Sequence, residues 1–127
     1  LKFPNLYPAK QEFDIQGELS VLPGIPGVIR HYHDALLMQH IDGDILCNSP
    51  KQPKDFFYKL KIIIDNIVGF GYGVSNDFGS NNVMVDKEQN PWVIDFGFYK
   101  KIKDEDRVTH LAMNKEQIAK LMLKFGI

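Results

Sequence analysis

The sequence lacks several features that would assign it to a specialised class of protein. It contains a single cysteine, Cys47, so no disulfide can form within the chain, and the disulfide framework of small secreted proteins is excluded. A lone cysteine fits a reducing compartment, and we expect a cytoplasmic protein. No apolar run approaches the roughly 20 residues of a membrane-spanning helix, and no signal-peptide pattern opens the chain, so we expect no membrane partner.

A strong charge of either sign is also lacking. The 127 residues carry 15 Lys and Arg against 16 Asp and Glu, which gives a net charge of −1. A nearly neutral chain has no long-range attraction to nucleic acid or to an anionic membrane surface, so we expect neither as a partner. What the chain does contain, 44% hydrophobic and 24% charged residues, is ordinary for a globular protein, and its length fits one domain.

Three segments have the apolar spacing of a helix. In residues 11–22 apolar side chains recur at intervals of four and three residues. Residues 55–68 are apolar around more than half of the helix circumference, so this helix, capped by Asp55, should form the core of the second half of the chain. Asn114, with Gln117 three residues later, resembles a capping box and is expected to open the third helix.

Two pairs of short strands are predicted. Residues 28–33 and 36–40 are separated by two residues, which indicates a hairpin. Residues 83–85 and 92–94 are apolar and flank a polar turn, which indicates a second hairpin. Residues 41–44 lack the ligand spacing of a calcium loop, and we interpret them as a connector.

Polar residues stand where the second hairpin opens. Asn82 precedes its first strand and Asp95 follows its second strand, so antiparallel pairing places the two side chains next to each other. Magnesium usually takes only one or two carboxylates in addition to phosphate oxygens and water. The sequence therefore predicts a magnesium site at Asn82 and Asp95.

The spacing around these residues resembles a known family. Asp77 followed after four residues by Asn82, and then Val-Ile-Asp95-Phe-Gly97, is similar to the catalytic loop and the metal-binding Asp-Phe-Gly of the protein-kinase-like superfamily. The resemblance implies catalytic roles for Asp77 and Asn82, with Asp77 as the base that takes the proton of an acceptor hydroxyl. It also implies that Asn82 and Asp95 bind Mg²⁺ together with the phosphates of ATP.

The same resemblance extends to the first third of the chain. Lys2 stands in the place of the strand lysine that holds the nucleotide phosphates, and Glu18 in the place of the helix glutamate that pairs with it. Residues 36–43 look like the strand and hinge that bind the adenine ring. The resemblance implies that Met38 is the gatekeeper of this nucleotide site and that Gln39 and His40 belong to its hinge.

Several positions depart from the pattern of protein kinases. Ser75 replaces the histidine that the family carries two residues before the catalytic aspartate, and Asn76 replaces the arginine that couples to an activation-loop phosphate. Gly79 replaces the lysine of protein Ser/Thr kinases, and 30 residues follow Gly97, too few for a peptide-binding helical subdomain. The chain therefore looks more like compact kinase-like proteins, including the aminoglycoside and choline phosphotransferases.

The resemblance implies an α+β fold in one kinase-like domain spanning residues 1–127. Residues 1–44 are expected to form a truncated small N-lobe sheet and the hinge, and residues 45–127 a minimal, mostly helical C-lobe that carries the catalytic β-hairpin. The sequence contains no glycine-rich loop before Leu1, so we expect one of three things: an upstream segment, a partner that covers the unpaired edge of the sheet, or a degenerate fold that no longer binds nucleotide well.

Two functions are compatible with these residues. The first is an ATP-dependent phosphotransferase that passes the γ-phosphate to a hydroxyl acceptor, with ATP and Mg²⁺ as cofactors. The second is a catalytically impaired, pseudokinase-like module that serves as a binding scaffold, which Ser75 and the missing glycine-rich loop favour. No cluster of residues indicates whether the acceptor is a small molecule or a protein.

Overall fold

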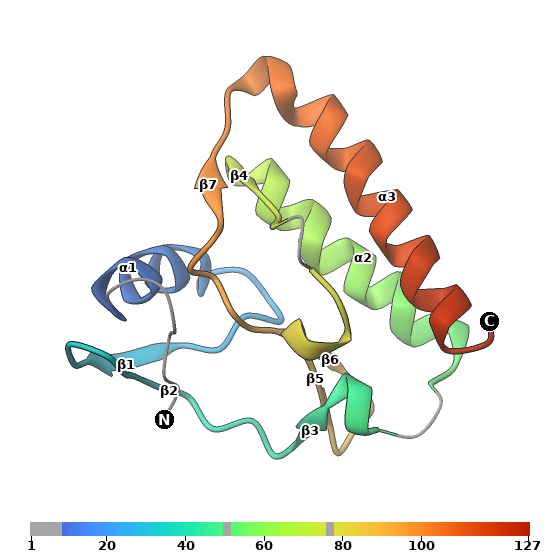
Figure 1. Ribbon diagram of the computed structural model, residues 1–127, viewed down its shortest axis with the longest axis horizontal. Coiled ribbons are helices and arrows are strands. Elements are labelled where there is room, and N and C mark those ends of the chain that lie inside the picture. Colours follow the sequence, from blue (N-terminus) through green and yellow to red (C-terminus); the bar gives the residue numbers. More distant parts are fainter. Residues whose placement is uncertain (1–8, 50–51, 76–77) are drawn as a thin grey trace.

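The computed structural model describes residues 9–49, 52–75 and 78–127. These residues form two parts, which lie at opposite ends of the molecule in Figure 1. The smaller part consists of a helix and a β-hairpin: α1 (Ala9–Leu19), β1 (Val28–His31) and β2 (Leu36–Met38). The larger part contains two long helices and five short strands: β3 (Gly43–Ile45), α2 (Lys54–Gly69), β4 (Tyr72–Gly73), β5 (Val83–Asp86), β6 (Pro91–Val93), β7 (Lys100–Lys101) and α3 (Arg107–Lys124).

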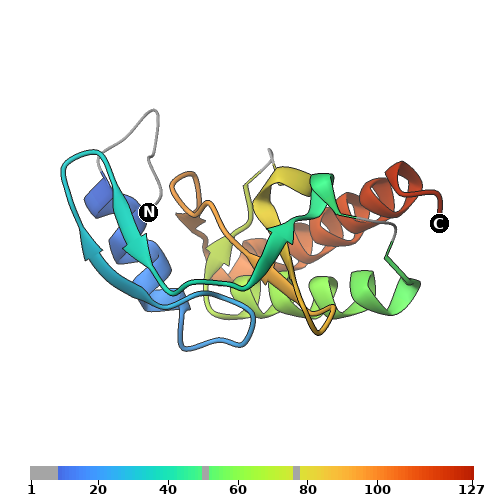
Figure 2. The same ribbon diagram turned by 90° about the horizontal axis from the view of Figure 1, so that it is seen from below.

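The smaller part is built by packing α1 onto the hairpin. Strands β1 and β2 pair antiparallel, with His31 opposite Leu36, which confirms the first predicted hairpin. The predicted helix is also present, but it runs from Ala9 to Leu19 instead of over residues 11–22. Gly17 faces this hairpin closely, because a Cβ there would lie 3.2 Å from a methyl group of Val28. Figure 2 shows the hairpin and α1 joined to the larger part by the segment that follows β2.

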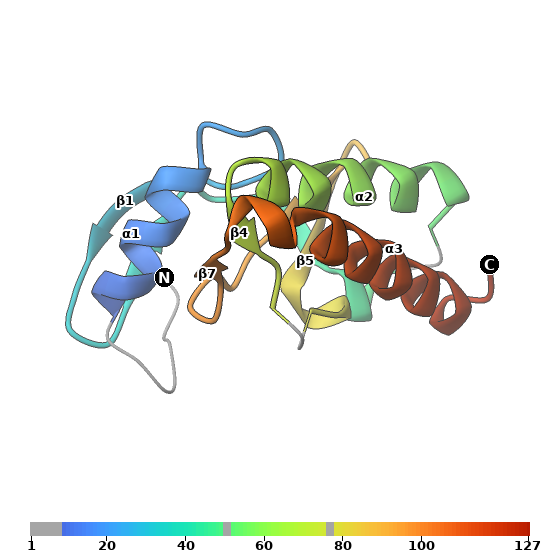
Figure 3. The same cartoon turned by 90° about the horizontal axis from the view of Figure 1, so that it is seen from above.

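The core of the larger part lies between α2, α3 and the strands. The two helices lie side by side in Figure 3, and α2 directs its apolar stripe into the core as predicted. The buried members of this stripe are Phe56, Phe57, Leu60, Ile63, Ile64, Ile67 and Val68. No helix in residues 9–49, 52–75 and 78–127 is long and apolar enough to cross a bilayer.

Both predicted helix caps in this part are wrong. Asp55 lies in the first turn of α2, where its carboxylate is 3.5 Å from Lys59 Nζ, and the residue before the helix is Pro53. Asn114 lies inside α3, which begins seven residues earlier at Arg107. Its side-chain amide donates to the carbonyl oxygen of Ile64 at 3.0 Å, so this asparagine ties α3 to α2. The Asn114–Gln117 spacing that resembles a capping box therefore belongs to a contact between two helices that are far apart in the sequence.

Residues 43–45 form a strand, and the prediction of a connector from residue 41 to 44 is wrong. They add a third strand to the hairpin of β5 and β6, with Gly43 opposite Asp86, and the order is β3-β5-β6. Glycine is needed here, because a Cβ at position 43 would lie 1.9 Å from the carbonyl oxygen of Val85. The pairing partner is 43 residues away in the sequence, so no local pattern signals it.

The second predicted hairpin is confirmed, and side-chain bonds fix its turn. Val83 pairs with Val93 and Val85 with Pro91. At the turn, Asp86 accepts hydrogen bonds from the backbone N–H of Asn90 at 2.8 Å and from the indole N–H of Trp92 at 2.9 Å. The register set in this way decides which residues meet at the open end of the hairpin.

Candidate functional site

Asn82 and Asp95 meet at the open end of the β5–β6 hairpin. Asn82 ends a 3₁₀ turn (Ser80–Asn82) immediately before β5, and Asp95 follows β6 by two residues. The side-chain amide of Asn82 donates to Asp95 Oδ2 at 3.2 Å, and the backbone N–H of Ile94 donates to the carbonyl oxygen of Asn82 at 2.9 Å. The structure therefore brings together the two residues that the sequence places at one site.

The side chain of Asn82 is held at both ends. Its Oδ1 accepts a hydrogen bond of 2.8 Å from the backbone N–H of Gly79, while its nitrogen faces Asp95. An amide oxygen has two lone pairs, so one remains for a further partner. The orientation of Asn82 is thus set by the loop before β5 and by the turn after β6.

Asp95 has an unusual backbone conformation. Its φ angle is 70°, in the left-handed region that residues other than glycine rarely adopt. Such conformations cost about 1–3 kcal/mol and concentrate at active sites and ligand-binding turns. The carboxylate of Asp95 is half-buried and directed at Asn82 by this turn.

Helix α1 holds the turn that follows Asp95. Glu12 is fully buried, and its Oε2 accepts a hydrogen bond of 3.2 Å from the backbone N–H of Phe96. Gln11, the preceding residue, donates its side-chain amide to the carbonyl oxygen of Gly97 at 3.3 Å. The two side chains therefore bind the N–H at the start and the carbonyl at the end of the Phe96–Gly97 dipeptide, which connects α1 to the turn that carries Asp95.

An aromatic pair forms the buried wall behind this turn. Phe96 is fully buried, and its ring meets that of Tyr99 edge to face with centroids 4.9 Å apart. Burial, and to a smaller extent the charge of Asp95, hold the pKa of Tyr99 far above its ordinary value. Tyr99 therefore stays neutral beside Asp95.

The structure places Glu18 at the other end of α1, against β4 and β7. Its Oε2 accepts a hydrogen bond of 2.7 Å from the hydroxyl of Tyr72, and its Oε1 lies 4.0 Å from Lys101 Nζ. Burial and the bond to Glu18 raise the pKa of Tyr72 to about 12. Lys2, the partner that the sequence suggests for Glu18, lies outside the described residues.

The three residues that the resemblance assigns to the nucleotide hinge lie at the end of β2 and in the segment from β2 to β3, where the two parts of the molecule join. Met38 ends β2 and accepts a contact of 3.5 Å from the side-chain amide of Gln16 at its sulfur. Gln39 is tied to Gly27 twice, through its backbone N–H at 2.7 Å and through its side-chain oxygen at 3.1 Å. His40 is exposed. Their position agrees with a link between two lobes.

Asn82 and Asp95 would hold a cation only together with ligands from outside the protein. Among the described residues, no three His, Cys, Asp or Glu side chains gather into a metal-binding group. Carboxylate and amide side chains such as Asp95 and Asn82 are of the type that binds Mg²⁺ together with waters and phosphate oxygens, but here Asn82 turns its nitrogen to Asp95 and its oxygen to Gly79. Residues of this type suit a metal that arrives with a phosphate compound. Asp77, the third predicted residue, lies outside the described residues.

Glu12 is the residue of this site that sequence reasoning missed. The apolar spacing of the first helix draws attention to Leu19 and its apolar neighbours, whereas Glu12 and Gln16 lie on the same buried face at intervals of seven and three residues before Leu19. Two polar residues in line with a buried leucine are the signal that could have found it.

Comparison with known proteins identifies the fold. No protein-family model matches the sequence, and no curated protein matches it. The arrangement of α1, the two-stranded hairpin, the link and the Asn82–Asp95 hairpin is, however, the protein-kinase-like α+β fold, as solved structures show. The bilobal fold that the sequence predicts is therefore confirmed.

Two of the solved structures that carry this likeness are of the Rio2 kinase from Chaetomium thermophilum. Its ADP/Mg²⁺-phosphoaspartate complex superposes with a TM-score of 0.72 at 18% identity, over 91% of this chain and 38% of that chain. A second structure of the same kinase gives a TM-score of 0.70 at 18% identity, over 88% of this chain and 38% of that one. The chain thus spans 38% of the length of these structures, and the likeness concerns the fold.

Proposed function

We propose that this chain binds ATP with Mg²⁺ and transfers the γ-phosphoryl group to a hydroxyl acceptor. The observation that carries the proposal is the contact of Asn82 with Asp95 in a kinase-like fold. Asp95 has a positive φ angle, and Glu12 of α1 binds the backbone N–H of the next residue, Phe96. The Rio2 kinase, which shares this fold, has been solved as an ADP/Mg²⁺-phosphoaspartate complex. These findings support a phosphate-binding role for the open end of the hairpin.

The residues at the hairpin would have different roles in the reaction. Asp95 and Asn82 would hold Mg²⁺, which when bound neutralises the charge of the phosphates. Asp77, five residues before Asn82 in the sequence, would orient the acceptor hydroxyl and take its proton. The acceptor oxygen then forms a bond to the γ-phosphorus, the bond from that phosphorus to the oxygen shared with the β-phosphate breaks, and ADP leaves.

The remaining residues would bind the nucleotide. Met38, Gln39 and His40 would line the adenine side, because they form the link between the two parts. Lys2 would hold the phosphates, as the sequence suggests. Burial supports Glu12 in place of Glu18 as the carboxylate that supports this site, because Glu12 contacts the peptide after Asp95 whereas Glu18 is engaged with Tyr72.

Ligand-induced stabilisation tests the proposal directly. A ligand that binds the folded state at 100 times its Kd stabilises it by about 2.7 kcal/mol, which raises the Tm of a small domain by several degrees. We expect ATP with Mg²⁺ to raise the Tm of the wild-type chain, and ATP with EDTA to raise it less. Asp95→Asn should remove the difference between the two conditions. A wild-type Tm that stays constant up to millimolar ATP and Mg²⁺ would instead support the binding scaffold.

A further inference from the structure

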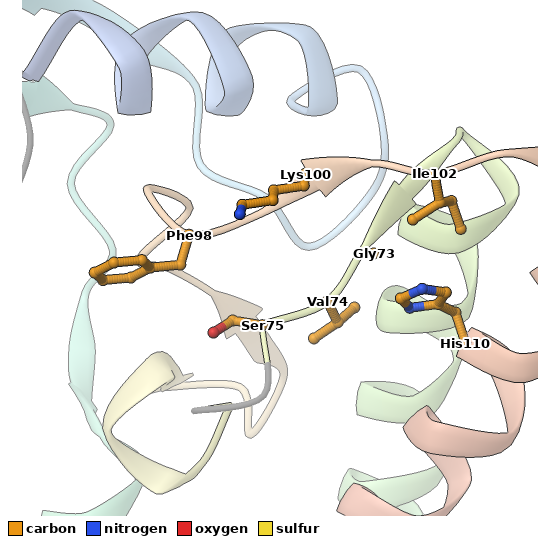
Figure 4. Close-up of a pocket in the computed structure, with 7 residues that line it drawn as sticks. All are labelled: Gly73, Val74, Ser75, Phe98, Lys100, Ile102 and His110. Carbon is orange, nitrogen blue, oxygen red and sulfur yellow. The ribbon is translucent and has the colours of Figure 1, made fainter. Parts of the chain in front are cut away.

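A pocket of about 400 Å³ opens between β4, the segment after Gly97 and α3. Volumes of this size are typical of sites for small molecules. The pocket is lined by residues from three separate elements (Figure 4), of which Ser75 and Phe98 lie at one end and Ile102 and His110 at the other. Its lining residue Phe98 belongs to the segment that follows Asp95, three residues further along the chain.

The charge of this pocket is one-sided. In the described part of the chain, its lining contains Lys100 and His110 but no Asp or Glu. No described carboxylate lies within ion-pair distance of Lys100, whereas the next residue, Lys101, faces Glu18. A hollow whose described lining carries a cation and no carboxylate attracts an anion.

The other end of the pocket is rigidly built. A Cβ at position 73 would lie 2.7 Å from Cε1 and 2.9 Å from Nδ1 of His110, so the imidazole ring packs directly on the backbone of Gly73. Gly73 is itself fixed in β4, where it pairs with Lys100 of β7. The β4–β7 pair therefore fixes the backbone at Lys100 relative to the ring of His110.

We infer that this pocket binds the acceptor of the proposed reaction, and that the acceptor is a small molecule with a carboxylate or phosphate group as well as a hydroxyl. Lys100 binds the anionic group, and His110 and the apolar side chains of Val74 and Ile102 hold the remainder. The inference rests on the proposed function, because it names the substrate class of that reaction.

The test follows the imidazole signal of His110 by ¹H–¹³C NMR, in the 127-residue chain without nucleotide. The probes are glycerol 3-phosphate, glycerate and glycerol, which share hydroxyl groups and differ in their charge. We expect the two anionic probes to shift the His110 signal and glycerol to leave it unchanged. The anionic probe that binds with the higher affinity shows whether the pocket prefers a phosphate or a carboxylate group. The other three histidines, His31, His33 and His40, lie on or near the β1–β2 hairpin and serve as internal references.

Two lysine variants decide whether the anion is bound where the geometry indicates. Lys100→Met should weaken binding of the anionic probe about tenfold, the loss expected for one charge-assisted contact. Lys103→Met changes an exposed lysine of the same segment that does not line the pocket, and should leave the affinity unchanged. Equal affinity in wild type and Lys100→Met, or equal binding of glycerol, would overturn the inference.

The acceptor role has its own measurement. A saturating anionic probe should change the rate at which the chain hydrolyses ATP with Mg²⁺, because an acceptor bound in the pocket would place its hydroxyl where water otherwise attacks. An unchanged rate with the pocket saturated would leave an anion site without an acceptor role and overturn that part. If instead ATP itself fails to bind in the thermal assay while the probe binds, the proposed function fails and not the anion site.

Discussion

The carboxylate of Glu12 accepts a hydrogen bond from the backbone N–H of Phe96, across 84 residues of sequence. It joins the helix of the smaller part to the turn that carries Asp95, while Gln11 binds the next carbonyl oxygen at Gly97. Because Asp95 has positive φ, its carboxylate direction depends on what restrains this turn. The position of α1 and the geometry of the candidate site are thereby linked.

The first prediction concerns Glu12. Glu12→Ala leaves the buried N–H of Phe96 without its partner, so it should lower the free energy of unfolding by about 1–3 kcal/mol. Glu12→Gln retains an acceptor oxygen but loses the charge, so it should fold with a smaller loss and bind ATP with Mg²⁺ less tightly than wild type. Denaturant unfolding and calorimetric titration measure the two effects.

Glu18→Gln is the matched control for Glu12→Gln, because both residues lie on α1 and Glu18 is exposed. We expect nucleotide affinity to change little in this variant. If Glu18→Gln weakens nucleotide binding more than Glu12→Gln does, then the original assignment of Glu18 to the nucleotide site is the better one.

The second prediction separates Asn82 from Asp95. Asn82→Ala removes an amide that binds the N–H of Gly79 and faces Asp95. It should lower the free energy of unfolding by about 1–3 kcal/mol. It should also make ATP binding less dependent on Mg²⁺. Asn82→Asp keeps an acceptor for the N–H of Gly79 and adds a charge beside Asp95. It should recover part of the Mg²⁺ dependence. Isothermal titration of ATP with and without Mg²⁺ distinguishes the two variants. If both variants show the same Mg²⁺ dependence of ATP binding, then Asn82 and Asp95 do not share a metal ion.

The third prediction concerns Asp77. If this residue takes the proton of the acceptor, Asp77→Ala should lower turnover by about 10²–10⁴-fold, the usual contribution of a general base. The affinity for ATP with Mg²⁺ should stay close to that of wild type, because the variant keeps Asn82 and Asp95. Turnover is measured as release of ADP. Turnover equal to that of wild type would remove Asp77 from the proposed mechanism.

The fourth prediction concerns the packing of α3 on α2. Asn114 is buried and donates to the carbonyl oxygen of Ile64 at 3.0 Å and to Asp65 Oδ1 at 3.2 Å. Asn114→Ala should therefore lower the free energy of unfolding by about 1–3 kcal/mol. Lys115→Ala changes the neighbouring exposed residue and should alter it by less than about 0.5 kcal/mol. Urea titrations compare the two, and similar values would show that the buried amide contributes little.

The fifth prediction is a loss of stability in alkali. The pKa of Tyr72 is raised to about 12 from its ordinary value of 10.0, first by burial and then by the bond to Glu18. Between these two pH values the folded protein keeps the proton that the unfolded chain has released. The stabilisation from the neutral hydroxyl is therefore complete below pH 10 and is lost as the pH rises towards 12.

Tyrosine variants identify the origin of this alkaline effect. Tyr72→Phe should show a smaller fall in stability above pH 10 than wild type, with the remainder due to the buried Tyr99. Tyr58→Phe changes a tyrosine that is half exposed and should keep the wild-type profile. Denaturant midpoints at several alkaline pH values provide the comparison. A Tyr72→Phe profile that matches wild type would assign the effect elsewhere.

The sequence by itself determined the features that depend on neighbouring residues. The apolar stripe of α2 and the two hairpins follow from residue spacing alone, because both periodicities are properties of short segments. The meeting of Asn82 with Asp95 was predictable for the same reason, since 13 residues and one tight turn fix their register.

Only the tertiary structure decided the remaining contacts of the site. Helical spacing places Glu12 on the face of Leu19, but it does not give the partners of the two glutamates. Glu12 contacts Phe96 and Glu18 contacts Tyr72 because of how α1 docks on the larger part. The third strand at Gly43 and the buried amide of Asn114 likewise depend on partners far away in the sequence. A short pattern records which face of an element is apolar, but the partner of a buried polar group is chosen only when the elements pack.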